Sequence, residues 1–142
     1  MTTFYIPLSR LSANEAFVAL LVAAIETDDH ASAEEAARAE HVLHEVPRLR
    51  RLSRFTRGRM IEEMKAAVRD HGAPAVMAAA AEHLPPALHR QALIAVAEVM
   101  SSRGLDRMES AALLDLASRF GLSPEDTASA LDEARRNVRL RN

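Results

Sequence analysis

The stretch AFVALLVAAIETDDHASAEEA, residues 16–36, decides the fold class of this chain. Its first ten residues are apolar, and the bulkier positions recur at helical spacing: Phe17, Leu20, Leu21, Ala24 and Ile25. Upstream, Ser12 and Glu15 have the spacing of a capping box, in which each side chain binds the other residue's backbone N–H. The pattern predicts a helix that begins after Ser12 and ends near Asp28.

This helix leads into an acidic turn and a second helix. Asp28 and Asp29 form the turn, and Ser32 with Glu35 repeats the capping-box spacing. The second helix should end before Pro47, because proline excludes the preceding residue from the α region. Two helices joined by a tight turn cannot bury an apolar stripe alone, so we expect further helices to pack on them.

The composition of the whole chain favours helices. Hydrophobic residues make up 49% of it but aromatic residues only 4%, so the core must be aliphatic. Four Gly, six Pro and the absence of alternating Val, Ile, Thr and Tyr argue against hairpins. We predict an all-α fold, a compact bundle of about seven to eight helices in one domain over residues 1–142. Further helix boundaries are indicated at Thr56, Gly72, Pro74, Pro85-Pro86, Gly104, Asp106, Gly121 and Ser123.

The chain also contains an internal repeat, over about residues 14–46 and 88–120. A shift of 74 positions aligns the two copies, including their capping positions: Leu20 with Ile94, Val22 with Val96, Ala23 with Ala97, Ile25 with Val99, Ser32 with Asp106 and Glu35 with Glu109. Chance similarity between amphipathic helices is the alternative, and the matching capping positions argue against it. We therefore predict a bundle with approximate two-fold internal symmetry.

On these stretches the chain resembles the TerB-like tellurite-resistance family, over about residues 14–134. That family's pattern is an alanine-rich helix, Ala-Asp-Gly, a spacer and Ser/Pro-x-Glu-Glu, to which residues 16–36 are similar. ALIAVAEVMSSRGLDRMESAALLDLASRFGLSPED, residues 92–126, resembles the second family copy, and AVMAAAAEHLPPALHRQAL, residues 75–93, resembles its Leu-Pro-x-x-Leu-Arg passage. The resemblance implies an all-helical bacterial cytoplasmic domain of tellurite and stress resistance. It also implies an acidic face for divalent cations, a basic face and an adaptor role, since similar domains are fused to co-chaperone and membrane-associated modules.

The resemblance places a metal site at the acidic turn. Carried over position by position, it implies Asp28, Glu35 and Glu109 as ligands. Asp29, next to Asp28, stands where the family has Gly and adds another carboxylate to the turn. In the second copy, Ser102 and Arg103 stand where the pattern has Asp-Gly. The implied site is therefore lopsided, and its cation should be weakly held.

The residues of the turn themselves leave two interpretations open. Ca²⁺ takes six to eight oxygen ligands, and carboxylates at Asp28, Asp29, Glu34 and Glu35 can supply some of them. The loop is not an EF-hand, since alanines occupy the positions that need Gly and the closing Glu. Alternatively, the two glutamates only stabilise the N-terminus of the following helix.

Charge is strongly segregated along the chain. Residues 1–46 carry a net charge of −6, residues 47–72 of +5 and the remainder of −1. The positive part contains six arginines in twelve positions: Arg48, Arg50, Arg51, Arg54, Arg57 and Arg59. Within it Leu49, Leu52 and Phe55 are three apart, which predicts that one side of the segment is buried.

Arginine forks suit carboxylates and phosphates, so this basic face has several candidate uses. The first candidate role of the segment is a solvated surface or an internal partner for the acidic segment. The second is the binding of an acidic protein or an anionic lipid headgroup. Nucleic acid comes last, because only Phe55 is available for stacking and the overall charge is −2.

Signatures of catalysis are absent from the sequence. There is no cysteine, and no Gly-x-Ser-x-Gly, phosphate-loop or His-Glu-x-x-His motif. His41 and His44 are one turn apart, but nothing indicates two more zinc ligands, so we expect surface histidines. The other four histidines follow no pattern. The chain shows neither a signal-peptide pattern nor an apolar run of membrane-spanning length, which favours a soluble cytoplasmic protein.

These patterns together favour a non-enzymatic TerB-like stress-response domain. It would bind a protein partner, through which it could associate peripherally with a membrane, and hold a divalent cation weakly, with Ca²⁺ as the candidate. A purely structural interaction module without metal is the alternative. An enzyme acting on a small oxyanion such as tellurite is a third interpretation, which the lack of thiols and redox motifs disfavours.

The metal prediction is tested by calorimetric titration with Ca²⁺, Mg²⁺ and Zn²⁺. We expect binding heat with Ca²⁺ that disappears in an Asp28→Asn/Glu35→Gln double variant, because both changes remove a carboxylate ligand. If no binding heat appears at millimolar metal, the cation site is ruled out, and the glutamates of the turn only stabilise the N-terminus of the following helix.

Overall fold

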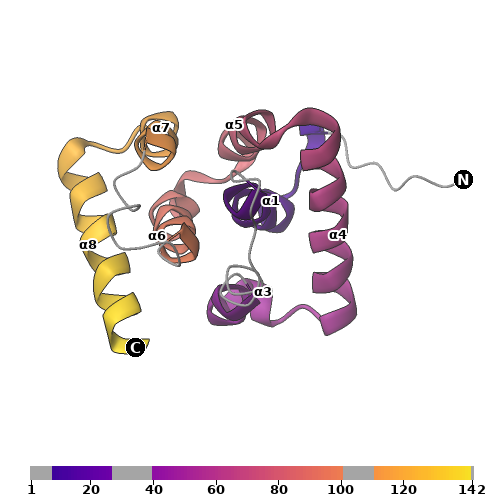
Figure 1. Cartoon of the computed structure of the whole chain (residues 1–142), viewed down its shortest axis with the longest axis horizontal. Helices are drawn as coiled ribbons and strands as arrows, with labels where there is room; N and C mark the ends of the chain where they lie inside the picture. Colours follow the sequence, from indigo (N-terminus) through magenta and orange to yellow (C-terminus); the bar gives the residue numbers. More distant parts are fainter. Residues whose placement is uncertain (1–7, 27–39, 101–110, 142) are drawn as a thin grey trace, which may run out of the picture.

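Two apolar helices, α1 (Ala13–Glu26) and α6 (His89–Met100), occupy the centre of the molecule (Figure 1). The structure is a computed structural model, and it describes residues 8–26, 40–100 and 111–141. In α1, residues 16–24 are each at most 4% exposed, and in α6, residues 92–99 are each at most 8% exposed. Helices that are apolar around their whole circumference must be covered on every side, and these two also contact each other.

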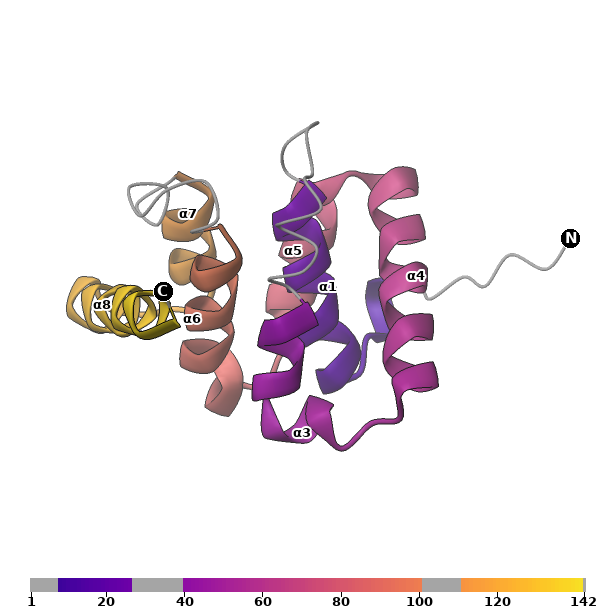
Figure 2. The same ribbon diagram turned by 60° about the horizontal axis from the view of Figure 1, so that its bottom comes forward.

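The other helices supply that cover. On one side α4 (Arg54–His71) and α5 (Ala73–His83) pack on α1, and on the other side α7 (Ala111–Arg119) and α8 (Pro124–Arg141) pack on α6. Figure 2 shows the same two groups from a second direction. Short elements complete the chain: η1 (Leu8–Arg10), a helical stretch over 40–45, α3 (Pro47–Arg50) and η2 (Pro86–Leu88).

The predicted all-α bundle of seven to eight helices is confirmed. Within the described ranges no strand occurs. None of the helices described there combines the length and the apolar character needed to cross a bilayer.

Most helix boundaries follow the local chemistry of the sequence. The capping box of α1 is formed: the Ser12 N–H donates to Glu15 Oε1 over 2.8 Å, and the Glu15 N–H donates to Ser12 Oγ over 3.1 Å. Gly72 and Gly121, at φ of +88° and +71°, follow α4 and α7, in a region that glycine adopts without strain. At the start of α8, Ser123 Oγ accepts the Asp126 N–H over 3.0 Å. These predicted boundaries are confirmed, while Gly104 and Asp106 lie outside the described residues.

Two predictions between α3 and α4 are wrong. The N-cap of α4 is Ser53 rather than Thr56, since Ser53 Oγ accepts the Thr56 N–H over 3.1 Å. The predicted buried side also fails, because Leu49 is buried but Phe55 is 79% exposed. The reason is that α3 ends at Arg50 and the chain turns before α4, so the spacing of three does not continue along one helix.

The described helix ends agree with the register of the internal repeat. The second helices of the two copies end at Glu45 and Arg119, which are 74 positions apart. The turns of both copies lie outside the described residues, and the repeat as a whole stays a prediction.

The central position of α6 predicts a large effect of shortening a side chain there. Leu93→Ala should lower the free energy of unfolding by about 2–5 kcal/mol, because Leu93 is fully buried and its loss leaves a cavity. Leu140→Ala, at an 86% exposed position of α8, should change it by less than about 0.5 kcal/mol. Chemical denaturation measures both, and equal losses would contradict the central position of α6.

Candidate functional site

The predicted cation ligands Asp28, Asp29, Glu35 and Glu109 all lie outside the residues that the structure describes. Within residues 8–26, 40–100 and 111–141, no group of three or more His, Asp or Glu side chains could hold a metal ion. The cation site therefore stays a prediction from the sequence.

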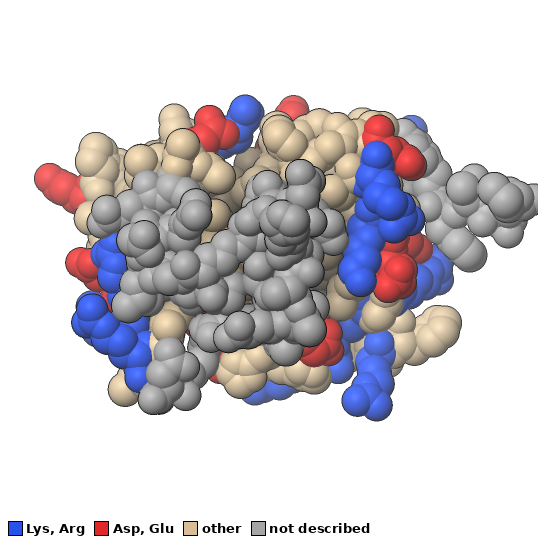
Figure 3. Space-filling model, viewed as in Figure 1, with Lys and Arg blue, Asp and Glu red and all other residues tan. Residues whose placement is uncertain are grey.

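Four of the six predicted basic residues form an exposed group where α3 meets the start of α4. We call this group, with the adjacent Phe55, the basic corner; its arginines are Arg48, Arg50, Arg51 and Arg54. Among the described residues, none of the four forms an ion pair with a carboxylate. Lys and Arg side chains project from the lower edge of the molecule in Figure 3, where Figure 1 places α3 and the first turn of α4.

Arg57 does not belong to this exposed group, which corrects the sequence prediction. It is only 8% exposed, and its Nη1 donates to the Leu52 carbonyl oxygen over 2.6 Å and to the Arg50 carbonyl oxygen over 3.4 Å. The guanidinium thus ties the first turn of α4 to the backbone between α3 and α4. A sequence signal for this burial exists, because Arg57 lies on the same helical stripe as the buried Met60 and Met64.

Arg59 is the sixth predicted basic residue. It is exposed, but its guanidinium forms an ion pair. Its Nε lies 2.9 Å from Glu63 Oε1, one turn further along α4. The predicted face of six arginines is therefore four exposed guanidinium groups, one buried clamp and one surface ion pair.

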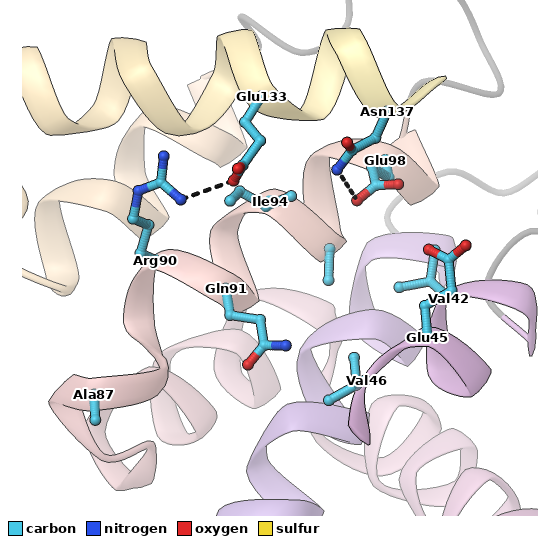
Figure 4. A pocket seen from close by; sticks show the side chains of 11 residues that line it. Val42, Glu45, Val46, Ala87, Arg90, Gln91, Ile94, Glu98, Glu133 and Asn137 are labelled. Carbon is cyan, nitrogen blue, oxygen red and sulfur yellow. Dashed lines mark hydrogen bonds and ion pairs between the residues drawn. The ribbon is translucent and has the colours of Figure 1, made fainter. Parts of the chain in front are cut away.

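A polar cleft with a volume of about 450 Å³ lies between α6, α8 and the helical stretch over 40–45 (Figure 4). At one end Arg90 Nη1 is 2.7 Å from Glu133 Oε2. At the other end the Asn137 amide donates to Glu98 Oε2 over 3.4 Å, and Glu98 is only 4% exposed. The remaining lining is Val42, Glu45, Val46, Ala87, Gln91, Ile94 and Ala95.

This cleft is a polar seam where α6 and α8 meet the helical stretch over 40–45. Its single arginine already binds a carboxylate, that of Glu133. The sequence analysis did not identify these residues, because they come from three distant segments. One signal was available: Glu98 interrupts the apolar run of α6.

The histidines within the described ranges that are detailed below have structural contacts rather than a shared site. His41 and His44 lie on the surface, as expected, each next to a glutamate one turn away, at 3.0 Å and 3.4 Å. His83 bridges two segments, with Nδ1 2.8 Å from the Ala79 carbonyl oxygen and Nε2 3.0 Å from that of Ser9. His89 stacks on Phe120, with ring centroids 4.2 Å apart.

Comparisons with protein-family models, with curated proteins and with solved structures found no match to this chain. The basic corner and the polar cleft are therefore interpreted from their own geometry.

The clamp at Arg57 predicts a difference between two neighbouring arginines. Arg57→Ala should lower the free energy of unfolding by about 2 kcal/mol, because two backbone carbonyls lose their donor and the packed side-chain stem is lost. Arg54→Ala, one turn earlier and exposed, should change it by less than about 0.5 kcal/mol. Urea denaturation measures both, and matching values would show that the clamp contributes nothing.

Proposed function

We propose that this chain is a non-enzymatic domain that binds an anionic partner through its basic corner. The single observation that carries the proposal is that Arg48, Arg50, Arg51 and Arg54 are all exposed within seven residues, with no described carboxylate paired to any of them. Guanidinium forks match carboxylate and phosphate oxygens, often with two hydrogen bonds at once.

The acidic side chains closest in sequence to the corner are already engaged elsewhere. Glu45 pairs with His41, Glu63 with Arg59 at 2.9 Å, and Glu62 with Lys65 at 3.6 Å. None of these three carboxylates pairs with a corner arginine, so the four guanidinium groups can attract an external anion.

The position of the arginines supports the same interpretation, because it opposes the preference of the helix. The N-terminus of a helix carries a partial positive charge and favours acidic residues, but the first turn of α4 has none. Arg54 and Arg57 stand there instead. Arg57 stabilises the fold through its two carbonyl contacts, but the charge of the exposed Arg54 opposes the helix dipole, whereas an anionic partner would gain from the sum of the dipole and the exposed arginines.

The resemblance to TerB-like proteins supplies the cellular context of the proposal. It supports a cytoplasmic role in tellurite or stress resistance, and a divalent cation weakly held at the acidic turn. Exposed arginines on a projecting corner suit binding better than catalysis, because an active site needs a pocket that excludes water. A structural module without metal remains the alternative, and the two differ in the calorimetric titration described above.

The proposal is tested with fluorescently labelled poly-L-glutamate, whose anisotropy should rise when the protein binds. We expect binding at 0.1 M salt that is lost at 1 M, since the screening length falls from about 10 Å to about 3 Å. Replacing all four corner arginines by glutamine should weaken binding roughly tenfold or more.

A matched control removes the same charge from other exposed positions, with the variant Arg10→Gln/Arg69→Gln/Arg136→Gln/Arg139→Gln. Its binding should stay within about twofold of the unmodified protein, since screening limits the reach of exposed charges. Equal losses in the two quadruple variants would mean that net charge alone, rather than the corner, determines binding.

A further inference from the structure

Phe55 belongs to the basic corner but carries no charge, so anion binding alone does not explain why its ring is exposed. It is 79% exposed and directly follows Arg54 in the first turn of α4. A single exposed apolar side chain is ordinary on a protein surface. An exposed aromatic ring next in the chain to Arg54, one of four exposed arginines that no described carboxylate pairs, is more specific, because it places an apolar contact next to anion-binding residues.

The shape of the corner limits the kind of partner that fits it. The turn from α3 into α4 lies at the edge of the molecule in both ribbon views (Figures 1 and 2). Neither the cleft beside α6 nor the hollow next to Phe55 has any of the four arginines in its lining. A peptide needs a groove or a sheet edge in which to lie, whereas a membrane surface offers many phosphates around a projecting corner.

We infer that the anionic partner of the basic corner is the surface of a phospholipid membrane with acidic lipids. The arginines bind headgroup phosphates, and the ring of Phe55 enters the interface between headgroups and acyl chains. The inference rests on the proposed function, because it names the partner of the same site. It differs from membrane association through another protein, since the contact is direct.

The four arginines and the Phe55 ring together should bind an acidic membrane more strongly than the arginines or the ring alone. Each basic side chain near an anionic surface is worth a factor of roughly five in partition. One buried ring adds roughly tenfold when it leaves water. Four arginines and one ring therefore give reversible binding that depends on lipid charge, which is the behaviour of a peripheral domain.

The Arg57 clamp gives the corner the rigidity that such binding needs. By holding the Leu52 and Arg50 carbonyls, it fixes the turn on which Arg51 and Arg54 stand. Less conformational freedom is then lost when the corner meets a surface.

The inference is tested by sedimentation with vesicles of phosphatidylcholine containing 30% phosphatidylglycerol, against phosphatidylcholine alone. We expect the full chain to sediment only with the acidic vesicles. Arg51→Gln/Arg54→Gln should weaken partition roughly 30-fold. The matched control Arg136→Gln/Arg139→Gln, with the same loss of charge on α8, should stay within about threefold.

The aromatic contact has its own readout, because the chain contains no tryptophan. In Phe55→Trp, the emission of the single indole should shift to shorter wavelength with acidic vesicles and stay unchanged with poly-L-glutamate. Phe55→Ala should weaken vesicle partition roughly tenfold.

The outcomes separate the inference from the proposed function. Binding of poly-L-glutamate without binding of acidic vesicles would overturn the inference and leave an acidic protein as the partner. Vesicle binding without an emission shift in Phe55→Trp would also overturn it, because the ring would then stay in water. If neither probe binds, both the inference and the proposed function fail.

Discussion

The mutual burial of α1 and α6 is the constraint on which the rest of the structure depends. Each helix has a continuous run of buried residues, 16–24 and 92–99, so neither has a face that can be left in water. Four helices are needed to cover this pair, and they form two groups, α4 with α5 and α7 with α8. The surface features of the molecule arise where these groups end or meet.

The polar cleft and the basic corner follow from this arrangement in different ways. The cleft lies between α6, α8 and the helical stretch over 40–45, and the Arg90–Glu133 pair links α6 to α8 at one end of it. The corner forms where the chain turns sharply from α3 into α4 on the outside of α1. Because a sharp turn leaves backbone carbonyls without helix partners, the buried Arg57 serves as their donor.

Charge segregation connects this architecture to the proposed function. Several surface arginines form local ion pairs, among them Arg59, Arg90, Arg119 and Arg135, whereas the corner arginines are left unpaired by the described carboxylates. Surface ion pairs contribute little to stability, so their absence at the corner costs the fold almost nothing. The corner is therefore free to serve binding, and the exposed ring of Phe55 adds an apolar contact to the charge.

The sequence by itself determined the elements. The all-α class and the boundaries at Ser12, Gly72, Gly121 and Ser123 follow from residues within one helical turn of each other, whose interactions are local. Only the tertiary structure decided which members of the arginine run are exposed. Arg57 shares a helical stripe with Met60 and Met64, but only the packed structure shows that Arg54 faces water while Arg57 binds two carbonyls across the turn. Likewise, the cleft joins Glu98 to Asn137, which are distant in the chain, and no local pattern can predict such a contact because it depends on how whole helices pack.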